Sequence, residues 1–185
     1  MRTVWHSERV FSVPGLLSSA ECAELIALAE GAGFDAASVR TPEGQQAMPR
    51  VRNNERAMVE DSPWTGTLWQ RLQAAELPVV EGQHAVGLPR SLRFYKYRPG
   101  QRFKMHKDGA WREDGRVSQL TLLVYLNDGY TGGCTDFRSF IVEPKAGSAL
   151  LFLHDSWHEG AAVVDGVKYV LRSDVLYGPS PKDFP

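Results

Sequence analysis

"MHKDGAW", residues 105–111, places a histidine and an aspartate two positions apart. The preceding residues, 93–104, are rich in aromatic and basic side chains and favour β-structure. Alternate side chains of a strand share one face, so His106 and Asp108 point one way and Lys107 the other. A His-x-Asp string alone is often ordinary surface polarity, so the rest of the chain must decide whether this pair is a site.

Two further histidines, His154 and His158, lie in "SALLFLHDSWHEG", residues 148–160. Two imidazoles and one carboxylate on one face of a metal, with the other positions open, is the arrangement of non-haem Fe(II) oxygenases. We favour His158 over His154 as the third ligand, because "HEG" leads directly into a turn and the final strand. His154 is predicted to be a strand-end residue, and His6 and His84 have no predicted role.

The last predicted strand, "VKYVLRSDVLY" (167–177), alternates sharply. Lys168, Arg172 and Asp174 fall on one face, and Leu171 falls on the other. Two cations on one face just after a metal ligand require an anion, because a buried cation is tolerated when it is paired. The alternative is a structural ion pair between Arg172 and Asp174, with Lys168 reaching solvent.

Strand-like segments dominate the chain after residue 90. They are separated by turns at "RPG", "NDGYTGGC", "KAG" and "VDG". The predicted strands are "SLRFYKY", "QRFKMHKD", "SQLTLLVYLN", "FIVEP", "SALLFLH" and "VKYVLRSDVLY". Helices first and many short strands afterwards predict a mainly β fold, a double-sheet barrel braced by flanking helices.

Two helices are predicted before residue 90. In the first, Ser18 and Glu21 have capping-box spacing and Gly31 is the expected stop. Its apolar face comprises Cys22, Leu25, Ile26 and Ala29. The second is expected from about Pro63 to Ala75, capped by Asp61 or Ser62. Its apolar stripe, Trp64, Leu68 and Leu72, is expected to pack in the core.

Composition and charge limit the protein class. The chain has 185 residues, 43% hydrophobic and 23% charged, which is ordinary for one globular domain. A net charge of −1 and a pI near 6.5 give no reason to expect nucleic acid as a partner. No apolar run could span a bilayer and no secretory signal begins the sequence, so we expect a cytoplasmic protein without a membrane partner. The two cysteines, Cys22 and Cys134, are expected to be reduced thiols.

Several ordered motifs carry a resemblance to a known family. They are "YRPGQRFKMHKDG" (97–109), "LLVYLND" (122–128), "GGCTDF" (132–137), and the closing section from "PKAGSALLF" (144–152) to "VLRSDVLY" (170–177). In this order the chain resembles the Fe(II)/2-oxoglutarate-dependent dioxygenases of the prolyl 4-hydroxylase type, over almost its whole length. The sequence departs from the family pattern at Cys134 and Asp136, so a substrate preference cannot be carried over from that turn.

The resemblance implies a double-stranded β-helix (jelly-roll, cupin-like) core at 90–178, with a helical support and lid region at 1–89, in a single domain over 1–185. His106, Asp108 and His158 match the iron ligands of the family. Lys168 matches the residue that binds the far carboxylate of 2-oxoglutarate, and Arg172 could share or replace it. The residues that match its cofactor-binding tyrosines are Tyr97 and Tyr125.

The implied reaction uses Fe(II), 2-oxoglutarate and O2. It hydroxylates an unactivated C–H bond of a prolyl or peptidyl, amino-acid or small-metabolite substrate and releases succinate and CO2. Two alternatives stay open at this point: a non-catalytic binding protein of the same fold, and a metal-dependent hydrolase with Glu159 as acid or base. A nucleic-acid demethylase is disfavoured by the charge balance.

Two polar segments could contact a substrate. The first, at 41–61, is predicted to be a loop or lid around a weak strand, and its polar cluster comprises Arg50, Arg52, Asn53, Asn54 and Arg56. A solvated loop is its ordinary explanation, although polar loops on a rigid scaffold often bind ligands. The second follows the first two ligands, where Trp111 belongs either to the mouth of the site or to an exposed linker. The sequence does not select the substrate or the oligomeric state.

Overall fold

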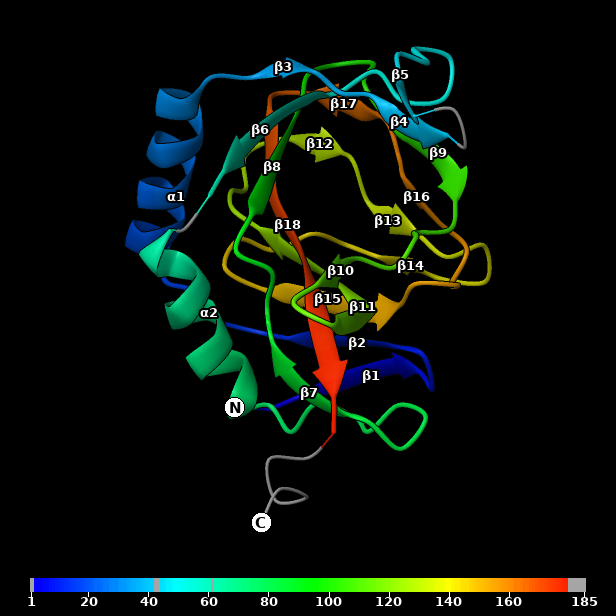
Figure 1. Cartoon of the computed structure of the whole chain (residues 1–185). Coiled ribbons are helices and arrows are strands. Elements are labelled where there is room, and N and C mark those ends of the chain that lie inside the picture. The colour runs from blue at the N-terminus through cyan, green and yellow to red at the C-terminus, as the bar shows by residue number, and fades with distance from the viewer. Residues whose placement is uncertain (1, 42–43, 61, 180–185) are drawn as a thin grey trace.

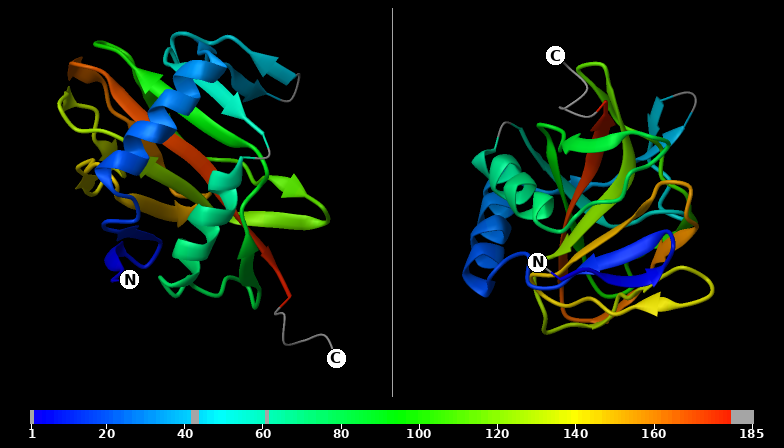
Figure 2. Two further views of the ribbon diagram at one scale, coloured as in Figure 1. Left: turned by 90° about the vertical axis from the view of Figure 1, so that its left-hand side faces the viewer. Right: turned by 90° about the horizontal axis from the view of Figure 1, so that it is seen from below.

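The chain folds into a β-barrel of two sheets with two helices on one side. A computed structural model describes residues 2–41, 44–60 and 62–179. Figure 1 shows the strands around a central axis and both helices together at one flank, and Figure 2 shows those helices lying across the outer face of the sheet. The expected mainly β architecture, with a double-stranded β-helix core, is confirmed.

The larger sheet has ten strands and extends through both halves of the sequence. Its main path is β1 (Val4–Ser7), β2 (Val10–Val13), β15 (Ala149–Leu153), β11 (Arg116–Tyr125), β18 (Lys168–Gly178), β8 (Leu92–Tyr97), β6 (Glu55–Val59) and β3 (Asp35–Ala36). Two further strands pair outside this path, β10 (Arg112–Glu113) with β11 and β7 (His84–Gly87) with β18. All its pairings are antiparallel.

The smaller sheet has four strands and closes the other side of the barrel. Its order is β14 (Ile141–Val142), β13 (Thr135–Asp136), β16 (His158–Gly160) and β9 (Phe103–His106). Two short ribbons complete the described strands: β12 (Thr131–Gly132) with β17 (Val163–Asp165), and β4 (Val39–Thr41) with β5 (Gly44–Gln46). Strand β9 is shorter than the strand predicted at 101–108, since it covers only residues 103–106.

The two helices form as predicted, with different ends. Helix α1 (Ser19–Ala32) has the capping box of Ser18 and Glu21, and helix α2 (Pro63–Gln73) has Ser62 as its N-cap. Asp61, the other candidate cap, lies outside the described residues. Helix α1 passes the predicted stop at Gly31 and ends at Gly33, where φ is +83°. A helix tolerates an interior glycine at a cost of about 1 kcal/mol, whereas the left-handed turn requires one.

Helix α2 ends two residues before the predicted Ala75, and a positive φ of +50° at Glu76 turns the chain away. The apolar stripes of both helices pack where they were expected. Cys22, Leu25, Ala29, Leu68 and Leu72 are buried, and Ile26 and Trp64 pack against the same core from half-buried positions. No helix among the described residues is both long enough and apolar enough to span a membrane.

The buried apolar residues form two clusters, one between the ten-stranded sheet and the helices and one inside the barrel. The helix-side cluster includes Leu171 and Val175 of β18, whereas Val170 of the same strand packs inside with Tyr95 and Tyr97. The ten-stranded sheet therefore has two buried faces, and the inward positions of β8, β11 and β18 carry the polar residues of the barrel interior.

The division predicted at residue 89 does not follow the architecture. The segment 1–89, expected to be helical support and lid, also supplies β1, β2, β3, β6 and β7 of the ten-stranded sheet. Short, polar or edge strands such as these carry too few alternating apolar residues to be distinguished from loops in the sequence. The first half of the chain is thus part of the barrel wall.

Candidate metal centre

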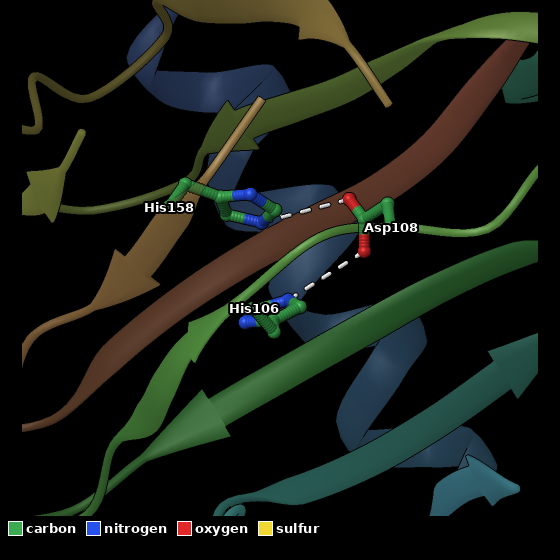
Figure 3. A group of neighbouring side chains, drawn as sticks. All are labelled: His106, Asp108 and His158. Carbon is green, nitrogen blue, oxygen red and sulfur yellow. Dashed lines mark ion pairs between the residues drawn. The ribbon is translucent and has the colours of Figure 1, made fainter. Parts of the chain in front are cut away.

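Three potential metal ligands converge at one mouth of the barrel. His106 is the last residue of β9 and His158 is the first residue of β16, and the two are direct cross-strand partners. Their imidazole centroids lie 4.2 Å apart. Asp108 follows β9 and reaches between them, 3.6 Å from each Nε2 (Figure 3). One ligand atom from each residue lies within 4.8 Å of the other two.

Both histidines present the ring nitrogen that a metal needs. His106 Nδ1 donates to the carbonyl of Lys104 (2.7 Å), and His158 Nδ1 donates to the carbonyl of Ser156 (3.0 Å). A protonated Nδ1 leaves the lone pair on Nε2, which in each residue faces Asp108. Burial also lowers the pKa of His158 to about 4, despite the attraction of Asp108, so its ring is neutral at pH 7.

Asp108 is held as a carboxylate by its neighbours. Burial by itself would raise its pKa, but the guanidinium of Arg172, 3.0 Å from Oδ2, and the two imidazoles hold that pKa well below its usual range. The Thr121 hydroxyl donates to the same oxygen at 2.6 Å. A carboxylate beside two imidazoles is the donor set that suits Fe(II), so the residues present fit the metal.

His154 supports this site from behind. Its Nδ1 donates to Thr121 Oγ1 (2.9 Å), and its Nε2 accepts from Ser118 Oγ (2.7 Å). Its carbonyl accepts from the backbone N–H of Asp108 at 3.0 Å. Burial lowers the pKa of His154, which agrees with a neutral ring in this chain of hydrogen bonds. The structure thus brings His158, and not His154, to the cluster of potential ligands, while His154 contacts Asp108 through its own carbonyl and through Thr121.

The two cations of β18 have different surroundings. Arg172 is buried between Asp108 (3.0 Å) and Asp174 (3.3 Å); burial opposes its charge, but the two carboxylates raise its pKa. Lys168 is 3% exposed and donates to the carbonyl of Gly133 at 2.6 Å. No carboxylate among the described residues lies within ion-pair distance of Lys168, and burial lowers its pKa to about 8. Lys168 is therefore the cation that is available for an anion.

The predicted tyrosines surround Lys168. Its Nζ lies 5.4 Å from the ring centre of Tyr97, its cross-strand partner, and 5.3 Å from that of Tyr125. Burial raises the pKa of Tyr97 to about 12, so its hydroxyl stays protonated. Tyr97 lines the pocket that joins Lys168 to the metal cluster, whereas the Tyr125 hydroxyl is engaged with Thr135 at 2.8 Å. The turn that departs from the family pattern is formed, and Gly133 supplies the carbonyl that Lys168 contacts.

Sequence reasoning missed several residues of this pocket. Tyr95 and Thr135, which line it, and Thr121, which donates to Asp108 from outside the lining, were not singled out, although Thr121 shares the inward face of β11 with Tyr125, and Tyr95 shares that of β8 with Tyr97. Alternation along those strands would have identified the first two. The residue proposed as acid or base of a hydrolase, Glu159, is absent from the residues that line the pocket; its carboxylate accepts the backbone N–H of Met105 at 3.1 Å.

The polar cluster of the loop at 50–56 divides into buried and exposed residues. Arg52 and Asn54 are buried, whereas Arg50 and Asn53 are exposed. Arg52 and Arg56 line a cavity that also contacts His106, Asp108 and Trp111. The loop is therefore not simply solvated. Of the two positions considered for Trp111, the mouth of the site and an exposed linker, the structure shows the first.

A mononuclear metal site of two histidines and one carboxylate inside a double-stranded β-helix defines a class of protein, the non-haem metal oxygenases. Residues 92–173 match the family model of the 2OG-Fe(II) oxygenase superfamily. This match, the His-Asp-His donor set and the prolyl 4-hydroxylase-like fold all support the expected class, a 2-oxoglutarate- and Fe(II)-dependent dioxygenase, together with its expected cofactors.

Solved structures show the same fold. A viral collagen prolyl hydroxylase from Paramecium Bursaria Chlorella virus-1 is 22% identical, with a TM-score of 0.64, over 92% of this chain and 97% of the other. A prolyl-4-hydroxylase from Pseudomonas putida is 18% identical, with a TM-score of 0.67, over 90% and 91%. A Trichoplax adhaerens prolyl hydroxylase, solved with a hypoxia inducible factor peptide, is 16% identical, with a TM-score of 0.67, over 92% and 84%. No curated protein matches the chain.

Proposed function

We propose that this dioxygenase hydroxylates an unactivated C–H bond of a prolyl or peptidyl, amino-acid or small-metabolite substrate, and converts 2-oxoglutarate to succinate and CO2. The observation that carries the proposal is the pocket itself. It joins the three ligands, His106, Asp108 and His158, to one buried amine, Lys168, that has no carboxylate partner among the described residues.

Lys168 is the proposed anchor of the C5 carboxylate of 2-oxoglutarate. A protonated amine in a buried, water-poor pocket binds a carboxylate more strongly than an exposed one does. Tyr97 and Thr135 line the same pocket and have hydroxyl groups that can donate to that carboxylate. Arg172 is a weaker candidate because its guanidinium already neutralises Asp108 and Asp174. We propose that Arg172 keeps Asp108 charged and oriented toward the metal.

Fe(II) bound with 2-oxoglutarate and O2 would supply the oxidising chemistry. The residues of the chain then have three tasks: His106, Asp108 and His158 hold the metal, Lys168 orients the co-substrate, and the barrel excludes water from the reacting atoms. Phe103 contributes to this exclusion, since its ring stacks on His106 with centroids 3.5 Å apart. The substrate would approach through the cavity that Trp111 and His106 line.

The test is an anaerobic titration with Fe(II) and 2-oxoglutarate, monitored by the weak visible absorption that chelation produces. We expect the band in the unmutated protein and its loss in His106→Ala. Incubation with 18O2 and candidate substrates should then yield products heavier by one labelled oxygen. A metal-binding protein without the band would contradict the proposed use of 2-oxoglutarate, and a different mass change would contradict hydroxylation.

A further inference from the structure

A second cavity adjoins the metal centre and differs from the pocket of Lys168. Its volume is about 550 Å³. It shares Tyr95, Phe103, His106, Asp108 and Arg172 with that pocket, but neither Lys168 nor Thr135 is among the residues that line it. A molecule in this cavity would reach the metal ligands from a different direction than one bound to Lys168.

The cavity is strongly basic. Its charged lining residues are Arg52, Arg56, Arg93, Lys107, Arg172 and Asp108. Arg93 is paired with Asp174, and Arg172 with Asp108 and Asp174. Asp108, the single acidic residue among the lining residues that the structure describes, would be occupied by the metal. Apart from Asp108, the acidic group among these lining residues is the Tyr95 hydroxyl; burial would raise its pKa, but Arg52, Arg172 and Arg93 lower it to about 7. The positive charges of the lining therefore outnumber the negative ones.

Arg52 is the buried member of this set. It is 6% exposed, and its guanidinium lies between two rings, 4.2 Å from the centre of Tyr95 and 4.5 Å from that of Phe103. Its Nε donates to Asn54 Oδ1 at 2.8 Å. Its Nη2, also buried, has no hydrogen-bond partner among the described residues. The Tyr95 hydroxyl also interacts with this guanidinium, but no carboxylate among the described residues forms an ion pair with it. A buried cation without an anionic partner is costly, which favours a ligand that completes this site.

The backbone holds Arg52 in this position. On one side of it the Val51 carbonyl accepts from Lys104 N–H at 3.0 Å, and on the other Asn53 Oδ1 accepts from Arg102 N–H at 2.8 Å. These bonds attach the loop to β9 immediately before His106. The guanidinium is thus positioned by the same strand that carries a metal ligand, and it lies against the rings of Tyr95 and Phe103.

We propose that the substrate of this oxygenase carries a carboxylate that Arg52 binds in the cavity beside the metal centre. This inference rests on the proposed function and names the substrate class that the site selects. The rings of Tyr95 and Phe103 lie against the guanidinium and Asn54 occupies its Nε, so the Nη edge, where Nη2 has no hydrogen-bond partner among the described residues, is the edge that a ligand can meet. A planar carboxylate matches such an edge with two parallel hydrogen bonds.

The carboxylate can belong to a small acid or to a peptide. The probes are N-acetylglycine, its uncharged isostere N-acetylglycinamide, and acetyl-Gly-Asp-Gly-amide, which carries the carboxylate on a peptide side chain. Binding is measured by isothermal titration calorimetry on the protein as isolated, and again with Fe(II) and saturating 2-oxoglutarate under argon. We expect N-acetylglycine to bind about tenfold or more tightly than the amide, the effect of one charge-assisted contact. Tighter binding of the tripeptide would assign the carboxylate to a peptide.

Arg52→Gln should abolish the preference for the acid without changing the 2-oxoglutarate affinity. Arg52→Lys, which keeps the charge but loses the fork, should retain part of the preference and serves as the test if the glutamine variant does not fold. Arg50→Gln is the matched control, because Arg50 is exposed on the same loop and lines a separate surface depression. Equal or unmeasurable binding of acid and amide, or a preference that survives in Arg52→Gln, would overturn the proposal. Loss of the Fe(II)–2-oxoglutarate absorption band would instead count against the proposed function.

Discussion

Removing the buried cation Lys168 should weaken 2-oxoglutarate binding without lowering the stability of the protein. Replacing it with methionine deletes the proposed partner of the 2-oxoglutarate C5 carboxylate and leaves a side chain of similar length among Tyr97, Tyr125 and Val170. We expect Lys168→Met to raise the Kd for 2-oxoglutarate by about a hundredfold or more, the range for removing one partner of a buried charge pair. Its melting temperature should stay the same or rise, because the empty protein loses an unpaired charge. Unchanged 2-oxoglutarate affinity in a calorimetric titration would exclude Lys168 as the anchor.

Arg172 should give the opposite result. Its guanidinium neutralises two carboxylates, Asp108 and Asp174, and both would be left buried without it. We expect Arg172→Met to lower the free energy of unfolding by about 3–5 kcal/mol, as removal of one member of a buried ion pair does. Urea denaturation measures this change. A variant as stable as the parent would contradict the assigned role.

The pH dependence of 2-oxoglutarate binding follows from Lys168. Burial lowers its pKa to about 8, so the amine is mostly charged at pH 7 and mostly neutral at pH 9. The co-substrate dianion binds the charged form, so its affinity should be nearly constant below pH 8 and fall about tenfold for each pH unit above it. Calorimetric titrations between pH 6.5 and 9.5 measure the profile. Lys168→Met should show a flat profile over this range.

At the level of elements, the turn before β15 attaches the barrel to helix α1. Gly147 has φ of +77°, accepts the Leu17 N–H at 3.0 Å and donates to the Tyr125 carbonyl at 2.8 Å. A Cβ at this position would lie 2.2 Å from the Leu17 carbonyl oxygen. We expect Gly147→Ala to destabilise the protein by about 2–4 kcal/mol through the left-handed backbone and the clash together.

Gly15→Ala is the matched control for that substitution. Gly15 also has a positive φ, +66°, but a Cβ there would have no heavy atom within 4 Å. It should therefore cost only the backbone term, about 1–2 kcal/mol. Chemical denaturation of both variants isolates the clash as the difference between them. Equal losses would show that the turn yields to the methyl group.

At the scale of the whole molecule, the metal site exists only in the folded barrel. Its ligands come from two strands that are separated by about fifty residues in the chain and paired in the smaller sheet. A metal that binds the folded state alone raises the free energy of unfolding by about 2.7 kcal/mol at one hundred times its Kd. Fe(II) under argon should therefore raise the melting temperature, and a chelator should reverse the effect. His106→Ala should show neither change, and a thermal shift that persists in this variant would point to another metal site.

Local patterns account for the parts of the fold that the sequence predicted. Capping groups and apolar spacing depend on residues within one or two turns, so both helices were found, with errors only at their C-terminal ends. The strands β11, β15 and β18 are largely buried on both faces, so they contain many apolar residues, which leave a strong signal in the sequence. The short strands of the first half have weak alternation, and only one weak strand, within the loop or lid at 41–61, was predicted among them.

From the sequence alone, residue identity and strand alternation predicted the three ligand types and a cation on the final strand, and the resemblance of its ordered motifs to a known family implied the class of protein. Tertiary structure decided how the cations are used. Arg172 meets Asp108 only where β18 faces the metal mouth, which leaves Lys168 without a carboxylate partner among the described residues. Arg52 becomes buried only because its loop crosses β9 and inserts it between two rings. Charge pairing and desolvation depend on residues distant in sequence, and no local pattern encodes them.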